Sequence, residues 1–595
     1  MNINWKQNNN EYLIQDIYDK LDKDLIFERL SYILNCSKEE IFKQVEEQEI
    51  LYLIANILIN RGITSKEDID KCFNNIGNSI NSPYILTNAE KAADKILEYL
   101  LNENAIIYIF ADYDADGLTA GYVFTSALKE VAKSKIILKY PERKEGYGLN
   151  MEWCKSIVDS NSNPKLVVTV DNGIAKINEV EYLKENNIDV IITDHHSSDD
   201  KGVPNCLIVD PHNEHEKQND NTKHLCGCGV AFKVAQIVQE KCNTFNMYNY
   251  TPYLAISTLT DVMPLTYENL AFIQYGLEII NGNNCPNNLK LLLKKLGIEV
   301  ATSNDILWTI GPLLNACGRM GNTNLGGKLL FENSIQDEDS FLDLVNQAIK
   351  INENRRSLTK EAQKEISELN FDEDKIVMFI SDKYPSGMIS IIAGKLAETF
   401  NKPSMCCNHL SNDIIHGSVR SIKGLDILSI FKQLEDEGLI ISSGGHKEAC
   451  VCNFKTENFD KVKQALNDKI IIEDTKVEEV TKEMFIDEDI SFSHLTKAVY
   501  ALVNLLPTDN KKLQTPIFKL NDLEVVSYKV SKNNPKNLCL KIKEGRREKD
   551  IWAWGLADRY IKTLNCSKRV SLIGKISKNI MGYGYVLNVE DILAS

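Results

Sequence analysis

The chain has 595 residues, enough for three or four domains with separate hydrophobic cores, which excludes a peptide or a single small module. Its net charge is −16 and its sequence pI about 5.3, so the molecule as a whole does not suit an all-over coat for nucleic acid or a membrane surface. The charge is uneven: residues 511–595 carry 17 Lys and Arg against 8 Asp and Glu, or +9, which leaves −25 for residues 1–510. A polyanionic partner must therefore meet a local patch, and the C-terminal segment is the candidate.

Apolar runs are short throughout the sequence. None approaches the roughly 20 residues that span a bilayer, and the opening MNINWKQNNNEY contains no apolar signal region. Fifteen cysteines without a regular spacing indicate reduced thiols rather than a disulfide framework. We therefore expect a cytoplasmic protein with no membrane partner.

The predicted elements follow one another in distinct blocks. Apolar positions recurring at three and four residues predict helices in the first hundred residues, and four apolar runs from residue 105 (AIIYIF, KIILKY, KLVVTV, DVIIT) predict parallel strands buried on both faces. A breaker-free stretch near 339–370 predicts a connecting helix, and short β-runs beyond residue 510 suit a small OB-like barrel. The expected fold class is α/β, with five regions: a helical region 1–100, a parallel-sheet domain 101–338, a connecting helix 339–370, a smaller α/β domain 371–475 and an OB-like β-barrel 476–595.

Acidic residues follow the predicted strands where each one ends. Asp112, Asp114 and Asp116 come after the first strand, Asp171 after KLVVTV, and the run Asp194-His195-His196 after DVIIT. The carboxyl ends of parallel strands meet at one edge of the sheet, so these groups should converge. The acidic hexapeptide by itself also fits a solvated loop or a calcium-type turn. The acidic and histidine residues at the other strand ends, together with Asp261 in LTDVMPL, favour a site for two hard divalent cations instead. Such a site activates water and neutralises the charge on a leaving oxygen.

The motifs DYDADG, DNG, DHH and DVMPL, in this order and at these strand ends, resemble the DHH phosphoesterases, and among them the RecJ-type single-strand-specific exonucleases. Further matches run through PERKEGYGL, IGPLLNACGRMG, GSVRSIKGLDI and SGGHKEA. The resemblance implies two Mn²⁺ or Mg²⁺ ions with Asp171 as the bridge between them. His196 would face the phosphate and act with Asp114, Asp116 and Asp171 in catalysis. The implied metal ligands are Asp112, Asp114, Asp116, Asp171, His195 and Asp261, with Asp112 either a ligand or a group that orients its neighbours.

The same resemblance implies a set of residues that hold the substrate. Arginine and serine side chains would grip phosphate oxygens, including a 5′-terminal phosphate, and a glycine-rich element would let backbone approach the strand. Arginines in glycine-containing loops could also be surface residues, the paired glycines only a turn, and the histidine a structural donor. The implied substrate-binding residues are Arg143, Arg319, Ser418, Arg420, Gly444, Gly445 and His446.

The expected function is a single-stranded-DNA-specific 5′ to 3′ exonuclease that acts in DNA repair and recombination, with a helicase and a single-strand-binding protein as candidate partners. One alternative is a DHH phosphodiesterase for short oligonucleotides or cyclic dinucleotides, which would not need the basic C-terminal segment. The other is an inactive DNA-binding scaffold, which the intact set of ligand residues argues against.

Overall fold

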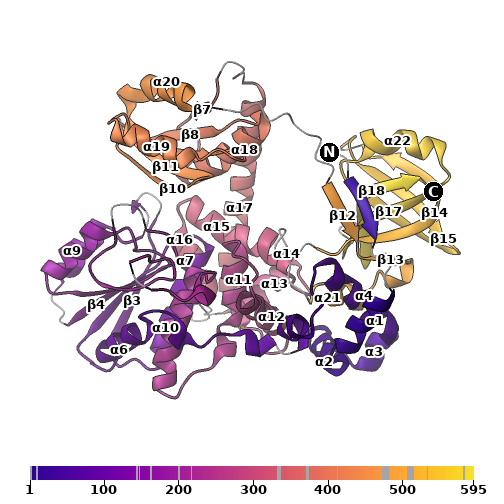
Figure 1. Ribbon diagram of the computed structural model, residues 1–595, viewed down its shortest axis with the longest axis horizontal. Coiled ribbons are helices and arrows are strands. Elements are labelled where there is room, and N and C mark those ends of the chain that lie inside the picture. Colours follow the sequence, from indigo (N-terminus) through magenta and orange to yellow (C-terminus); the bar gives the residue numbers. More distant parts are fainter. Residues whose placement is uncertain are drawn as a thin grey trace.

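The fold is described from a computed structural model of the full chain (Figure 1). In that structure the described residues are 3–7, 11–74, 76–142, 145–146, 148–160, 164–198, 202–215, 217–331, 337–369, 371, 374–411, 413–471, 482–505, 515–532, 534–579 and 583–594.

The first block is helical, as the apolar spacing predicts. The longest of these helices, Glu47–Asn60, buries all the aliphatic side chains of the sequence EILYLIANILIN. Ser and Asp side chains cap several neighbouring helices at their N-termini. The helices and short turns are α1 Glu11–Lys20, α2 Lys23–Leu34, α3 Lys38–Phe42, α4 Glu47–Asn60, α5 Lys66–Ile69, η1 Asp70–Asn74, η2 Ile76–Ser79 and η3 Pro83–Ile85.

A five-stranded parallel sheet in the order β3-β2-β4-β5-β6 forms the next domain. Every residue of the central strand β4 is buried, because helices cover both faces of the sheet. The fifth strand, β6, has only three residues, and the sequence pattern missed it. The elements are α6 Ala89–Leu100, β2 Ile106–Phe110, α7 Ala115–Lys129, β3 Lys135–Lys139, α8 Met151–Val158, β4 Lys165–Val170, α9 Ile177–Glu185, β5 Asp189–Thr193, β6 Leu207–Val209 and α10 Gly227–Lys241.

Helices complete this domain and lead to a second lobe. The predicted connecting helix is present as α17, Glu338–Ser367, which joins the two lobes (Figure 1). The preceding elements are η5 Asp220–Thr222, η6 Met247–Asn249, α11 Thr251–Thr260, α12 Tyr267–Asn281, α13 Asn287–Leu296, α14 Ser303–Asp305, η7 Ile306–Ile310, α15 Gly311–Arg319 and α16 Thr323–Leu330.

The second lobe holds a mixed sheet in the order β10-β11-β9-β8-β7, in which only β7 and β8 are parallel. It stands above the edge of the first sheet in Figure 1. Its elements are β7 Val377–Ile380, η9 Ser386–Met388, α18 Ile389–Phe400, β8 Ser404–Ser411, β9 Ile414–Arg420, α19 Ile427–Asp436, β10 Ser442–His446, β11 Ala449–Lys455, η10 Thr456–Asn458 and α20 Phe459–Lys469.

The C-terminal part is a curved antiparallel sheet in the order β16-β15-β14-β17-β18, compatible with the expected OB-like fold. The N-terminal strand β1, Ile3–Gln7, pairs in parallel with β12 of this part, and β13 pairs with β14. The remaining elements are β12 Lys482–Ile486, β13 Glu488–Ile490, η11 Phe492–His494, α21 Lys497–Val503, β14 Phe518–Val530, β15 Leu538–Glu544, β16 Arg547–Ala553, α22 Ala557–Cys566, β17 Arg569–Lys578 and β18 Tyr585–Ala594.

One hydrophobic core joins the two ends of the chain. Buried side chains between Ile17 and Phe73 pack in the same cluster as buried side chains between Ile490 and Ile592. The N-terminal helices and the C-terminal sheet therefore stabilise each other, and they lie side by side in Figure 1. The boundaries at residues 100 and 476 stay predictions.

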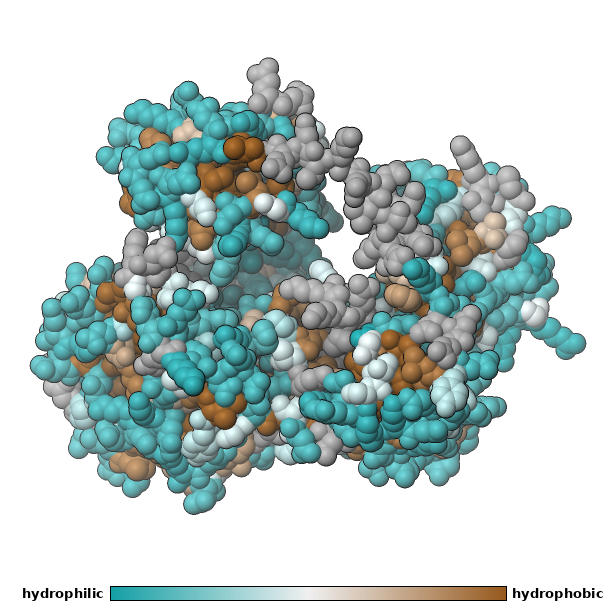
Figure 2. Space-filling view, viewed as in Figure 1, coloured by the Kyte–Doolittle hydropathy of each residue, from teal (hydrophilic) through white to brown (hydrophobic). Residues whose placement is uncertain are grey.

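The surface in Figure 2 is largely hydrophilic, with hydrophobic residues in small separate groups, and it is hollowed between the second lobe and the C-terminal sheet. Among the described helices, none is both long and apolar enough to cross a lipid bilayer.

Candidate metal centre and cleft

The first acidic motif turns directly from β2 into α7. Asp114 is the N-cap of α7, and its side chain accepts a hydrogen bond from the backbone N–H of Gly117 at 3.0 Å. A Cβ at Gly117 would lie 2.6 Å from the Asp112 Cα, so only glycine allows the chain to fold back this closely. The turn brings Asp112 and Asp114 to the same sheet edge.

Asp116 is held by residues far away in the sequence. The backbone N–H groups of Gly227 and Cys228, at the start of α10, donate to its two oxygens at 2.8 and 2.9 Å, and the Ser257 hydroxyl donates as well. Three donors fix the orientation of this carboxylate. Gly227 is required here because a Cβ would lie 2.1 Å from the Asp171 Oδ1. The CGCG motif thus serves close packing, and neither of its buried cysteines joins a possible metal cluster among the described residues.

Asp171 follows β4 in a left-handed conformation, with φ of 62°. That backbone conformation is unusual for a residue other than glycine and is typical of functional sites. The next residue, Asn172, supports the turn: its amide donates to the Phe110 and Val170 carbonyls at 3.0 and 2.9 Å. The ends of β2 and β4 are thereby tied together, which sets the spacing of their carboxylates.

His195 lies among carboxylates from three elements. Its Nε2 is 3.2 Å from Asp171 Oδ1, 3.6 Å from Asp116 Oδ2 and 3.8 Å from Asp261 Oδ2. Asp261 ends α11, and Val262 after it has a φ of 56°, a strained value for a β-branched residue. Burial lowers the pKa of His195 despite the nearby Asp116 carboxylate. The neutral imidazole that results is the form that binds a metal.

All six predicted metal ligands come together at this edge. Their ligand atoms form three groups, each within 4.8 Å, and Asp171 belongs to two of them: Asp112, Asp114 and Asp171; Asp116, His195 and Asp261; Asp171, His195 and His196. Burial, and then the charges of Asp116, Asp114, Asp112 and Asp261, raise the pKa of Asp171 well above its usual value. Such crowding is unfavourable unless cations neutralise it, and the carboxylate oxygens that dominate this set are donors that suit Mn²⁺ and Mg²⁺. The residues present therefore fit a pair of divalent ions.

His196 is directed by the completely buried Asp194. Asp194 Oδ1 lies 2.8 Å from His196 Nδ1 and accepts from the backbone N–H of His195 at 2.8 Å, while Oδ2 accepts from Ile174 N–H at 2.9 Å. Although burial lowers the pKa of His196, Asp194 raises it to about 10 through its charge and hydrogen bond, with smaller contributions from Asp261 and Asp112. Asp194 thus holds the His196 ring in place at the cleft, which His196 also lines.

A cleft of about 780 Å³ lies between the sheet edge and the second lobe, and Asp194 and His196 line it. Six of the seven predicted substrate-binding residues line the same cleft, and the seventh, Arg143, lies outside the described residues. The six are Arg319, Ser418, Arg420, Gly444, Gly445 and His446.

The two arginines of the cleft differ in their surroundings. Arg319 ends α15 and reaches the second lobe, where its Nη1 donates to the Gly387 carbonyl at 3.2 Å and the Ser390 hydroxyl at 2.9 Å. Arg420 ends β9 and donates to its neighbouring Val419 carbonyl at 3.0 Å. Arg319 thus links the lobes as well as facing the cleft.

The glycine pair has two separate roles. Gly445 has a φ of 135° and packs against β11, where a Cβ would lie 2.5 Å from the Ala449 carbonyl oxygen. The fold itself therefore requires Gly445. A Cβ at Gly444 would meet open space, so Gly444 is the position where backbone is accessible from the cleft.

Sequence reasoning missed three residues of this site. The motif Asp194-His195-His196 gave no separate role to Asp194, which orients His196. No sequence feature indicated Ser257, whose hydroxyl donates to Asp116. Lys176, half-buried at the start of α9, also lines the cleft. The only sequence feature that could have indicated Lys176 as a cleft residue is its position five residues after Asp171.

Comparison with known proteins agrees with this architecture. Residues 106–258 match the DHH family, N-terminal domain, and residues 372–471 match the DHHA1 domain. The chain thus carries, in this order, a region similar to the DHH family N-terminal domain and a region similar to the DHHA1 domain. The second lobe contains the region that matches the DHHA1 domain.

Two relatives are similar to this chain over at least 70% of its length. The single-stranded-DNA-specific exonuclease RecJ of Bacillus subtilis is 29% identical over 455 residues, which is 74% of this chain and 55% of that protein. RecJ of Haemophilus influenzae is 27% identical over 447 residues, 70% of this chain and 74% of that protein. This chain thus spans about half the length of the Bacillus relative and three quarters of the Haemophilus one.

Solved structures show the same fold. RecJ from Thermus thermophilus in complex with Mn²⁺ has a TM-score of 0.69 at 22% identity, covering 91% of this chain and 76% of that one. An exonuclease RecJ bound to manganese has a TM-score of 0.55 at 26% identity, covering 65% of this chain and 95% of that one.

Proposed function

We propose that this chain is a metal-dependent exonuclease that hydrolyses single-stranded DNA from its 5′ end and releases 5′-mononucleotides. The observation that carries the proposal is the convergence of five carboxylates and His195 at a sheet edge next to an inter-lobe cleft. The names of the relatives agree with the reaction class.

The ligand residues divide into two sets, and Asp171 of the first set links them because its Oδ1 lies 3.2 Å from the His195 Nε2 of the second. Asp112 and Asp114 would hold one ion with Asp171, and Asp116, His195 and Asp261 would hold the other. When bound, the ions supply Lewis-acid activation of water and neutralise negative charge on the phosphate. The backbone donors at the start of α10 would keep Asp116 oriented for this task.

His196 would supply a proton. With Asp194 on its Nδ1 side, the His196 ring would donate its Nε2 proton to the leaving oxygen or to a phosphate oxygen in the cleft. Asp194 stabilises the imidazolium and prevents the ring from turning.

The second lobe would position the strand. Arg319, Ser418 and Arg420 suit phosphate oxygens, and Arg143 is retained as a further phosphate-binding candidate. Gly444 and His446 would lie beside the nucleic-acid backbone. The basic C-terminal segment, at +9, would add affinity for a longer strand, and a helicase or a single-strand-binding protein in the cytoplasm would supply or protect that strand during repair and recombination.

The test uses purified protein with Mn²⁺ and single-stranded DNA labelled at either end. We expect mononucleotides from the 5′ end, no cutting of duplex, and no activity in an Asp171→Asn variant prepared in parallel, which excludes a contaminating nuclease. Cleavage restricted to di- and trinucleotides or cyclic dinucleotides would favour a small-substrate phosphodiesterase. Binding without hydrolysis would favour a scaffold.

A further inference from the structure

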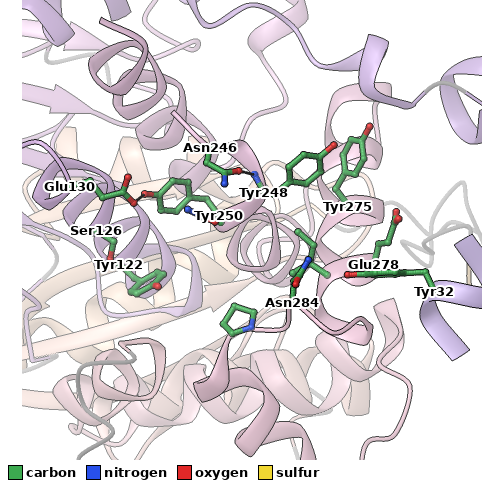
Figure 3. Close-up of a pocket in the computed structure, with 13 residues that line it drawn as sticks. Tyr32, Tyr122, Ser126, Glu130, Asn246, Tyr248, Tyr250, Tyr275, Glu278 and Asn284 are labelled. Carbon is green, nitrogen blue, oxygen red and sulfur yellow. Dashed lines mark hydrogen bonds between the residues drawn. The ribbon is translucent and has the colours of Figure 1, made fainter. Parts of the chain in front are cut away.

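A second large groove, of about 900 Å³, lies away from the metal centre (Figure 3). Its walls come from α2, α7, α12 and residues 246–250, and none of its lining residues lines the catalytic cleft. The carboxylates of the metal centre stand at the N-terminus of α7, whereas this groove lies at the C-terminus, about 22 Å away along a 15-residue helix. The proposed exonuclease reaction does not use it.

The groove is electronegative for two reasons. Its acidic residues stand at helix C-termini: Glu130 is the C-cap of α7, and Glu278 lies in the last turn of α12. Helix C-termini carry partial negative charge, which adds to that of the carboxylates. The described lining residues include no Lys, Arg or His. Two sources of negative potential therefore coincide at Glu130, while at Glu278 the paired Arg29 offsets part of the charge.

Both carboxylates are held in place and can still accept a ligand. Glu130 accepts from the Tyr250 hydroxyl at 2.6 Å and from the Gln239 amide at 2.8 Å, both neutral donors. Glu278 pairs with the nearly buried Arg29 at 3.6 Å. A carboxylate offers about four acceptor positions, so both residues keep capacity for further donors.

Tyrosine rings line the groove between the two carboxylates. Figure 3 shows Glu130 and Glu278 toward opposite ends with tyrosines between them. Tyr248 and Tyr275 meet edge to face, with ring centroids 5.6 Å apart. Aromatic faces attract organic cations and also contact their methylene groups. The five tyrosines that line the groove are Tyr32, Tyr122, Tyr248, Tyr250 and Tyr275.

We propose that this groove binds a linear aliphatic polyamine, with one ammonium group at Glu130, another at the Glu278 end, and the methylene chain along the tyrosines. A nucleotide would meet two carboxylates and no lining cation, so its phosphates are disfavoured. A small metal ion would leave the aromatic walls unused. The volume lies within the usual range of small-molecule sites, roughly 300–1,000 Å³.

The test titrates spermidine into the full-length protein by calorimetry, without DNA and with Mg²⁺ in excess so that the acidic metal centre is occupied. Saturable binding to one site is expected, at least tenfold weaker in Glu130→Gln and in Tyr248→Ala. Tyr248 is half exposed, so its replacement does not open the core, and melting curves check that both variants fold. The matched control is Glu185→Gln, since Glu185 is also an exposed residue at a helix C-terminus, that of α9, but lies outside the groove.

Two results would overturn the proposal. One is the absence of saturable spermidine binding to the parent protein. The other is equal affinity in the parent, Glu130→Gln and Tyr248→Ala proteins, which would mean that spermidine only joins the ion atmosphere of an acidic molecule. Butylamine, with a single ammonium group, should bind much more weakly than putrescine if both ends of the groove take part.

Discussion

Replacing Asp194 with Asn should impair hydrolysis in a way that depends on pH. Asp194 keeps His196 protonated, with a pKa of about 10 in the described structure. An amide carries no charge, so the pKa of His196 should fall to about 6.5, the usual value, or below it. Bound ions would neutralise Asp261 and Asp112 but not Asp194, so the direction of the change holds with the metals present.

The magnitude follows from the two pKa values. At pH 8, a pKa near 10 leaves about 99% of His196 protonated, whereas a pKa near 6.5 leaves roughly 3%, a difference of about thirtyfold. At pH 6 the same change costs less than about twofold, because both forms are then mostly protonated. The imidazolium is lost as pH rises through the pKa, so the defect must grow with pH.

The assay is the initial rate of mononucleotide release from labelled single-stranded DNA between pH 6 and pH 8.5, with Mn²⁺ held in excess. His196→Gln and the double variant Asp194→Asn/His196→Gln complete a mutant cycle. If Asp194 acts through His196, its replacement should have little further effect when His196 is absent. A loss that is equal at all pH values, or that adds fully to the loss from His196→Gln, would refute the proton-donor role.

Three further predictions test other parts of the molecule. Mn²⁺ at a hundred times its dissociation constant should stabilise the parent protein by about 2.7 kcal/mol in thermal melts, and most of this gain should vanish in Asp171→Asn; full retention would contradict the shared-ligand role. If Arg319 binds a terminal phosphate, the parent protein should degrade 5′-phosphorylated strands faster than 5′-hydroxyl strands. This rate difference should shrink in Arg319→Ala but not in Arg356→Ala, which replaces an exposed arginine on α17. An unchanged difference in Arg319→Ala would exclude Arg319 as the phosphate-binding residue. Trp5→Ala should lower the free energy of unfolding in urea by about 1–3 kcal/mol, since the Trp5 indole donates to Asp591 at 2.6 Å and packs against the C-terminal sheet; unchanged stability would show that β1 is dispensable.

The sequence predicted well which acidic and histidine side chains converge, because their positions are local to strand ends. Asp112, Asp171 and His195 follow β2, β4 and β5, and parallel strands place such residues at one edge whatever the details of packing. The connecting helix was predictable for a similar reason, since its period and lack of breakers need no tertiary information.

Contacts between distant segments could not be predicted in the same way. The Ser257 hydroxyl donates to Asp116 across 141 residues. The two backbone N–H groups that also bind this carboxylate belong to Gly227 and Cys228, within a motif whose cysteines draw attention to metal binding instead. The sequence pattern did not predict β6, because three residues are too few to show the two-residue alternation of a strand. The contact between Arg319 and the second lobe depends on how two domains dock, which a side-chain pattern does not encode.

The core shared by the two ends of the chain has a consequence for synthesis. About 400 residues separate Phe73 from Ile490, so at roughly 5–20 residues per second the first helices leave the ribosome about 20–80 s before the sheet that covers them. During that interval the apolar faces of these helices are exposed and can bind chaperones or one another. A chain released early, for example near residue 510, would keep the complete metal centre yet lack this cover, and we expect it to be removed by proteolysis or to aggregate rather than persist as a smaller nuclease.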